Sequence, residues 1–220
     1  MVPRASGQVN EIIAFVKLKI GALDFDLECR LLAEIRARYS SSEVTLRVDA
    51  NGAFSPEEAL QKLDRLSEFD VHSIEQPIAA GQLEAMRKLC GQTPIPIALD
   101  EALIGVLDAA DKAALLDEIE PQYIILKPSL LGGFTAAEAW IALAEARNIG
   151  WWVTSALESN IGLNAIAQWT ATQNTSMPQG LGTGGLFTNN IDSPLVAEKG
   201  VLRYNNALSW DTKYILKLKQ

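Results

Sequence analysis

The sequence has very few of the residues from which disulfide frameworks and thiolate or imidazole metal sites are built. It holds one histidine and two cysteines in 220 residues. Cys29 and Cys90 are far apart and show no Cys-x-x-Cys spacing, so we interpret them as reduced core thiols. His72 stands alone near the predicted start of a strand, where we expect a structural role. A metal in this chain would therefore need oxygen ligands.

Long apolar runs and an excess of positive charge are also missing. No stretch approaches the ~18 consecutive apolar residues of a membrane span. Residues 1–10 lack the apolar segment of a secretion signal, and we expect them to be a disordered leader before one domain over 11–220. The net charge of −8 argues against nucleic-acid binding. We therefore expect a cytoplasmic protein with a small-molecule substrate, which, if anionic, would need local positive charge.

The chain does contain a regular alternation of short apolar, β-branched runs and helical patterns. Each run ends in a residue of functional interest, and these residues follow one another at intervals of 25 to 30 positions: Lys19, Asp49, Glu75, Asp100, Lys127, Ser155 and Gly182. The pattern predicts seven strands with six intervening helices, in an α/β fold with a parallel sheet. The last of these strands is expected at Gln179–Gly182, and the tail could add edge strands at 202–204 and 214–218.

Such an alternation fits either a closed barrel or an open doubly wound sheet. In a barrel all strand ends converge on one face, whereas an open sheet concentrates its site at a switch point. Because six or seven successive strands end in chemically useful residues, the pattern favours a TIM-type (β/α)7β barrel.

Local signals place three of the helices. An apolar stripe at steps of four predicts the buried face of the first helix, and consists of Leu27, Leu31, Ile35 and Tyr39. Ser55–Glu58 reads as a capping box with proline at the first helical position, and Thr135–Glu138 as a second capping box. We expect the tryptophans to pack in the core rather than to form a ligand cage.

Three carboxylates end consecutive predicted strands: Asp49, Glu75 and Asp100. Three anions that converge in a partly buried site repel one another strongly unless a cation holds them. Carboxylate oxygens without thiolates or imidazoles are ligands of Mg²⁺, with Mn²⁺ as the alternative ion. We predict a metal site formed by these three residues.

Two lysines lie on strands that flank the predicted metal site from opposite sides. Lys19 and Lys127 would face each other across the cavity. A lysine acts as a general base when its pKa is lowered, and the neighbouring cations, Lys17 and the metal, act in that direction. An opposed ammonium and a metal would stabilise the dianion formed when a proton leaves carbon next to a carboxylate. The implied reaction class is proton abstraction α to a carboxylate.

Taken together, these motifs resemble the enolase superfamily, in its muconate-lactonizing subgroup and nearest to the o-succinylbenzoate synthases. The motifs are Lys17-x-Lys19, Arg47-Val-Asp49-Ala-Asn51, Glu75-Gln-Pro77, Asp100-Glu101, Lys127-Pro-Ser129, Thr154–Ser159 and Gly180–Gly184. The resemblance covers about residues 16–204. It implies a Mg²⁺-dependent lyase of menaquinone biosynthesis that forms 2-succinylbenzoate by syn dehydration of 2-succinyl-6-hydroxy-2,4-cyclohexadiene-1-carboxylate.

The resemblance also implies residue roles. Lys19 would take the α-proton and return it to the departing hydroxyl, while Lys127 would stabilise the enediolate. Lys17, Arg47 and Asn51 would support these groups, and Ser155 and Gly182 would line the succinyl side. From the residues alone, a plain salt bridge is an equally simple role for Arg47, which shares the side of its strand with Asp49.

The chain departs from the family pattern at its start. It reaches Lys17 almost at once, so the family's capping domain and first strand–helix unit are not visible, and the expected barrel is incomplete. Exposed strand edges at the resulting seam would invite association between copies or with a capping segment. Two other functions therefore remain open. One is racemisation or epimerisation of N-acylamino acids or dipeptides by the opposed lysines, and the other is a truncated barrel without activity.

Overall fold

The structure is a computed structural model and describes residues 14–211 and 213. The expected leader at 1–10 and the possible strand at 214–218 lie outside the described residues. Strands alternate with helical segments through the first six strands, as predicted. The strands are β1 (Ala14–Lys19), β2 (Val44–Asp49), β3 (Val71–Glu75), β4 (Ile97–Leu99), β5 (Tyr123–Leu126), β6 (Gly150–Val153), β7 (Leu195–Glu198) and β8 (Val201–Tyr204). The helices are α1 (Phe25–Arg38), α2 (Pro56–Ser67), α3 (Leu83–Gln92), α4 (Ala109–Ile119), α5 (Pro128–Leu131), α6 (Phe134–Glu145) and α7 (Asn160–Thr172), with a 3-10 turn at Glu101–Leu103.

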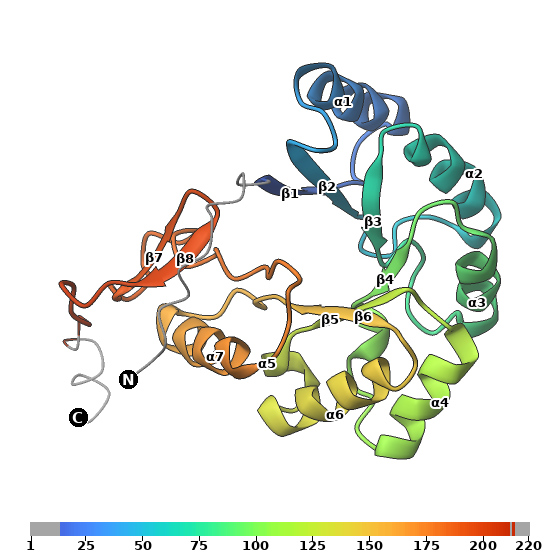
Figure 1. Ribbon diagram of the computed structural model, residues 1–220. Helices are drawn as coiled ribbons and strands as arrows, with labels where there is room; N and C mark the ends of the chain where they lie inside the picture. Colours follow the sequence, from blue (N-terminus) through green and yellow to red (C-terminus); the bar gives the residue numbers. More distant parts are fainter. Residues whose placement is uncertain (1–13, 212, 214–220) are drawn as a thin grey trace.

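The first six strands form one parallel sheet in the order β1-β2-β3-β4-β5-β6. Figure 1 shows this sheet curled around a centre, with the helices outside it. The order in space equals the order in sequence, as expected when each helix returns the chain to the next position in a parallel sheet. All six carboxyl ends therefore point to one face.

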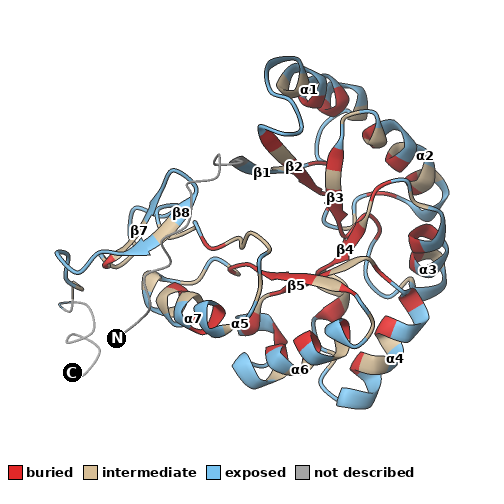
Figure 2. Ribbon diagram, viewed as in Figure 1, coloured by how far each residue is buried: buried red, intermediate tan, exposed pale blue. Residues whose placement is uncertain are grey.

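The main core lies between the outer face of the sheet and the helices. Leu46, Val48 and Ile74 on the strands and Leu63 and Leu66 on α2 are completely buried. Figure 2 shows buried residues along the strands and on the inward sides of the helices. The predicted capping box is confirmed at α2, where the Ser55 N–H donates to the Glu58 carboxylate at 3.1 Å.

Two local helix predictions are wrong. The stripe of α1 lies largely outside the core: Leu27, Leu31 and Tyr39 are 38%, 41% and 50% exposed, while Cys29 and Leu32 are buried. A step of exactly four residues drifts around a helix of 3.6 residues per turn, so it does not mark the buried face alone. Thr135 does not cap α6, because the helix already begins at Phe134 after Gly133.

The seventh parallel strand was predicted at Gln179–Gly182 and is reduced to a single bridge between Thr154 and Gly180. A β-carbon at Gly180 would lie 2.6 Å from the Thr154 hydroxyl oxygen, so only glycine permits this close approach. The expected strand at 202–204 is present as part of β8, which pairs antiparallel with β7 in a separate two-stranded sheet. The described sheet is thus a curled six-stranded array in which β1 is an edge strand.

The tryptophan prediction is confirmed for Trp140, Trp151, Trp152 and Trp169, which are at most 9% exposed. Within the described residues, we find no helix with the length and apolar character needed to cross a membrane.

Candidate active site

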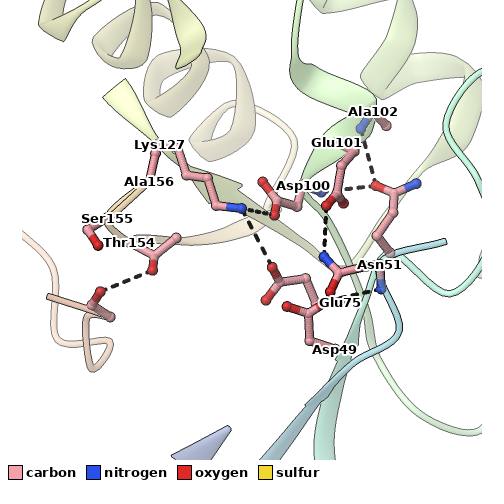
Figure 3. Close-up of polar contacts among 12 residues, drawn as sticks. Asp49, Asn51, Glu75, Asp100, Glu101, Ala102, Lys127, Thr154, Ser155 and Ala156 are labelled. Atoms are coloured by element: carbon pink, nitrogen blue, oxygen red, sulfur yellow. Dashed lines mark hydrogen bonds and ion pairs between the residues drawn. The ribbon is translucent and has the colours of Figure 1, made fainter. Parts of the chain in front are cut away.

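Strand register brings the predicted site residues together. Lys19 pairs with Asp49 across β1 and β2, and Asp49 pairs with Glu75 across β2 and β3. Asp100 follows β4 and Lys127 follows β5 at the same carboxyl edge. Figure 3 shows Asp49, Glu75 and Asp100 directed towards a common region, with Lys127 approaching from the side of β5. The predicted meeting of these strand ends is therefore present in the fold.

The three carboxylates are buried and pair with lysine amines. Asp49, Glu75 and Asp100 are at most 3% exposed. Lys17 Nζ lies 2.9 Å from both Asp49 Oδ2 and Glu75 Oε2, and Lys19 Nζ lies 2.6 Å from the same Asp49 oxygen.

Lys127 reaches the group from the opposite side. Its Nζ donates to Asp100 Oδ2 and lies 4.0 Å from Glu75 Oε1. Lysines thus neutralise the carboxylates from both flanks, as such a buried group of anions requires.

These contacts change the pKa values of the group. Burial raises the pKa of Glu75 to about 8; Lys17 opposes this shift, and Asp100 and Asp49 add to it. Burial would also raise the pKa of Asp49, but Lys17 and Lys19 outweigh it and hold that pKa below its ordinary value. Burial would lower the pKa of Lys17, yet Glu75 and Asp49 raise it. Lys17 is therefore kept charged by the carboxylates beside it.

The donor set is suited to a hard divalent cation. It consists of carboxylate oxygens, and Glu75 Oε1 is buried without a hydrogen-bond partner. As the side chains lie, no three His, Cys, Asp or Glu residues within residues 14–211 are close enough together to hold one ion. Because lysine amines contact the oxygens that an ion would need, binding requires these amines to withdraw.

Asn51 connects Lys19, the candidate base, to the turn after β2. Its backbone is left-handed, with φ of 44°, which asparagine tolerates better than most residues. Its N–H donates to Asp49 Oδ1 at 3.0 Å, and its Oδ1 accepts from Lys19 Nζ at 2.5 Å. The amide also donates from Nδ2 to Glu101 Oε1 at 2.9 Å.

Arg47 lies away from the carboxylates and makes no ion pair within the described residues. Its guanidinium carbon lies 3.9 Å from the centre of the Trp152 ring and 5.1 Å from that of Phe15. Burial lowers its pKa to about 10, against the influence of Tyr123 and Glu75. The salt bridge considered from sequence is absent among the described residues, and Arg47 makes a cation–π contact with Trp152 instead.

Ser155 and Gly182 occupy different surroundings. The Ser155 hydroxyl shares a hydrogen bond of 2.6 Å with Thr183, a residue that sequence reasoning did not select. Gly182 lines a groove of about 770 Å³ with Phe15 and residues of α7, β7 and β8. This groove lies beside the β1 edge and does not include the carboxylates.

Gln76 was also missed, although it stands between two residues of a quoted motif. It is completely buried, and its Oε1 accepts from the backbone N–H groups of Asp100 and Ala102 at 3.1 and 3.2 Å. It thereby fixes the turn that carries the third carboxylate. A glutamine directly between a strand-end carboxylate and a proline is the sequence signal that could have identified it.

Known proteins are similar to this chain in sequence. The family model described as "Enolase C-terminal domain-like" matches residues 1–207. The o-succinylbenzoate synthase of Desulfotalea psychrophila is 62% identical over 202 residues, which are 92% of this chain and 55% of the relative. The L-Ala-D/L-Glu epimerase of Bacillus subtilis is 28% identical over 79% of this chain and 47% of its own. The chain spans about half the length of these relatives.

Solved structures agree with the fold. The crystal structure of MenC from Desulfotalea psychrophila matches with a TM-score of 0.82 and 59% identity, over 87% of this chain and 53% of that one. The muconate cycloisomerase of Pseudomonas fluorescens matches with a TM-score of 0.81 and 29% identity, over 94% of this chain and 58% of that one.

Proposed function

The chain belongs to the enolase C-terminal domain-like family, and we propose that it carries the active-site half of an o-succinylbenzoate synthase. The reaction is the syn dehydration of 2-succinyl-6-hydroxy-2,4-cyclohexadiene-1-carboxylate to 2-succinylbenzoate, a carbon–oxygen lyase reaction. The observation that carries this proposal is the placement of Lys19 and Lys127 on opposite flanks of three buried carboxylates. The 62% identity to a synthase supports the choice of substrate.

The two lysines divide the chemistry. Lys19, with a neutral amine, takes the proton from the ring carbon that carries the carboxylate. Lys127, as an ammonium, faces the resulting enediolate and stabilises its charge. Lys19 then returns the proton to the hydroxyl as the carbon–oxygen bond breaks, so that water leaves and the ring becomes aromatic. One base on one face of the ring accounts for the syn course.

Asp49, Glu75 and Asp100 would hold Mg²⁺, or Mn²⁺ in its place. When bound, the ion supplies positive charge beside the substrate carboxylate. Lys17 and Asn51 would support and orient these groups, and Ser155 and Gly182 would line the succinyl side. For Arg47 we propose indirect support through its contact with Trp152 inside the sheet.

The proposal is tested by adding the cyclohexadiene substrate to the purified 220-residue chain with Mg²⁺ and following aromatisation by absorbance. Lys19→Ala and Lys127→Ala should each reduce kcat by about 10²- to 10⁴-fold, the usual contribution of a positioned acid or base. Lys88→Ala, at an exposed site on α3, is the matched control and should leave the rate unchanged. A wild-type chain that folds, by circular dichroism, and forms no product contradicts the lyase proposal and favours an inactive barrel portion.

A second candidate is racemisation of N-succinylamino acids by the same opposed lysines, in keeping with the epimerase among the relatives. Exchange of the α-hydrogen for solvent deuterium, lost in both lysine variants, would support it. Dipeptide epimerisation is less favoured, because Gly182-Thr183-Gly184 stands where such enzymes carry an Asp-x-Asp.

Partners and location follow from the same proposal. We propose a small carboxylate substrate and a cytoplasmic setting. We also propose that the edge of β1 is covered by another copy or by a capping segment, because an edge strand presents unpaired backbone groups.

A further inference from the structure

We propose that Glu101 is a positioning residue for Lys19, acting through the amide of Asn51. This inference rests on the proposed role of Lys19 as the base. The three side chains form a continuous chain of hydrogen bonds at the carboxyl ends of β1, β2 and β4. Lys19 Nζ donates to Asn51 Oδ1 at 2.5 Å, and Asn51 Nδ2 donates to Glu101 Oε1 at 2.9 Å. Figure 3 shows the contact between Asn51 and Glu101.

Glu101 decides which end of the Asn51 amide faces Lys19. An ionised carboxylate only accepts hydrogen bonds, so the amide must direct its NH₂ group to Glu101. The amide oxygen is then directed to the lysine. With the opposite orientation, the amide oxygen would meet the Glu101 carboxylate, and this contact would be repulsive whatever the charge on the Lys19 amine. Glu101 thus makes Asn51 an acceptor for Lys19.

The backbone holds this amide in place. Asn51 lies in a left-handed turn whose N–H bonds to Asp49 Oδ1 at 3.0 Å. The next residue, Gly52, also has a positive φ, and a β-carbon there would lie 2.8 Å from the Ala79 backbone. The Asn51 side chain therefore projects from a turn with little freedom to move.

The hydrogen bond between Lys19 and Asn51 matters most when the carboxylates hold the proposed metal. Lys19 also bonds to Asp49 Oδ2, an oxygen that the proposed metal would need. Asn51 would then be the acceptor that continues to orient the Lys19 amine. Among the described residues, the Glu101 carboxylate has no other hydrogen-bond partner than Asn51, because its Oε2 is buried without one. The one side-chain hydrogen bond that Asn51 donates there also goes to Glu101, so the two side chains serve each other.

The test changes the hydrogen-bonding polarity of the pair while conserving side-chain shape, and the double variant also conserves the net charge. In Glu101→Gln the side chain at 101 can donate as well as accept, so the Asn51 amide is free to turn over. In the double variant Asn51→Asp, Glu101→Gln, the carboxylate at 51 accepts from both neighbours, and the net charge equals that of the wild type. We expect Glu101→Gln to lower kcat by about 10- to 100-fold with little change in KM, and the double variant to recover most of the loss.

A second readout does not depend on turnover. The rate at which a trace acylating reagent labels Lys19 is measured by mass spectrometry in saturating Mg²⁺, with exposed Lys88 as the internal reference. Losing the hydrogen bond to Asn51 Oδ1 should free the Lys19 amine and speed its labelling about tenfold in Glu101→Gln, with recovery in the double variant. Glu101→Asp, which keeps the acceptor, should lie between, and serves if Glu101→Gln fails to fold.

The outcomes separate this inference from the proposed function. Labelling that follows the polarity of the pair supports the positioning role even if the wild-type chain forms no product. Equal labelling in all variants overturns it, whether or not the chain is a synthase. Loss of Mg²⁺-dependent thermal stabilisation in Glu101→Gln with unchanged Lys19 labelling would assign Glu101 to the metal instead, and would also overturn it.

Discussion

At the scale of single residues, neighbours on adjacent strands determine what each side chain does. Glu75 and Asp49 are both buried carboxylates in register, yet the pKa of one is raised and that of the other is lowered. Burial dominates at Glu75, which has one amine at 2.9 Å and another only at 4.0 Å. At Asp49 two amines contact one oxygen, at 2.9 and 2.6 Å, and together they outweigh burial. Residue type alone could not have separated these two environments.

His72 should make the stability of the protein depend on pH. Burial, assisted by Arg47, lowers its pKa below the ordinary 6.5. The unfolded chain therefore binds a proton at a higher pH than the native protein, so this contribution to stability is present above pH 6.5 and is lost as pH falls through the lowered pKa. In urea titrations the wild type should lose more stability between pH 7.5 and 5.5 than His72→Gln does. Equal losses would contradict this assignment.

Cys90 should be chemically inert in the native protein. Burial on α3 raises the pKa of its thiol to about 12, so almost no thiolate exists at pH 8. Maleimide at that pH should leave Cys90 unmodified for hours in native buffer and modify it within minutes in urea, as measured by mass spectrometry. Fast native labelling would show that α3 opens readily.

At the scale of elements, periodicity predicted most helices and strands, but not the reduction of the seventh parallel strand to one bridge and not always the faces that the helices bury. The alternation from β1 to β6 follows from the sequence because apolar patterning and turn residues are local signals. The face of α1 does not, since burial depends on what lies beside the helix. Likewise, the fine pairing at Gly180 and the buried role of Gln76 depend on contacts between distant segments.

A pair of leucine substitutions tests the assignment of helix faces. Leu63 on α2 is completely buried, so Leu63→Ala should cost about 2–5 kcal/mol of unfolding free energy. Leu27 on α1 is 38% exposed, and Leu27→Ala should cost less than about 1 kcal/mol. Urea denaturation of both variants measures the difference. Similar costs would mean that the stripe predicted from sequence is covered in solution.

At the scale of the whole molecule, a curled sheet carries the candidate site on its carboxyl edge while β1 remains an edge strand. The positions of the three carboxylates and two lysines could be predicted because each of these residues lies at the end of one strand of the parallel sheet. The ion pairs between these lysines and carboxylates were not predicted, although the amines occupy the oxygens that the proposed metal would need. Whether a metal binds therefore depends on all the lysines and carboxylates along this edge of the sheet.

Magnesium should stabilise the folded chain. A ligand that binds only the native state, at about 100 times its dissociation constant, adds about 2.7 kcal/mol. Thermal unfolding with Mg²⁺, compared with NaCl at equal ionic strength, should show this gain in the wild type and in Asp26→Asn, an exposed control on α1. Asp49→Asn should show little gain. Equal stabilisation of all three proteins would place the ion elsewhere.

The neighbour-by-neighbour order of the sheet has a consequence for how the protein folds. Each strand from β1 to β6 pairs with the next in sequence, so the array can grow one strand–helix unit at a time without closing long loops. The three carboxylates belong to three successive units. Asp49 and Glu75 come together when β3 pairs with β2, but Asp100 joins them only after β4 has docked beside β3. The moment at which metal affinity appears during refolding would therefore report when β2, β3 and β4 have paired.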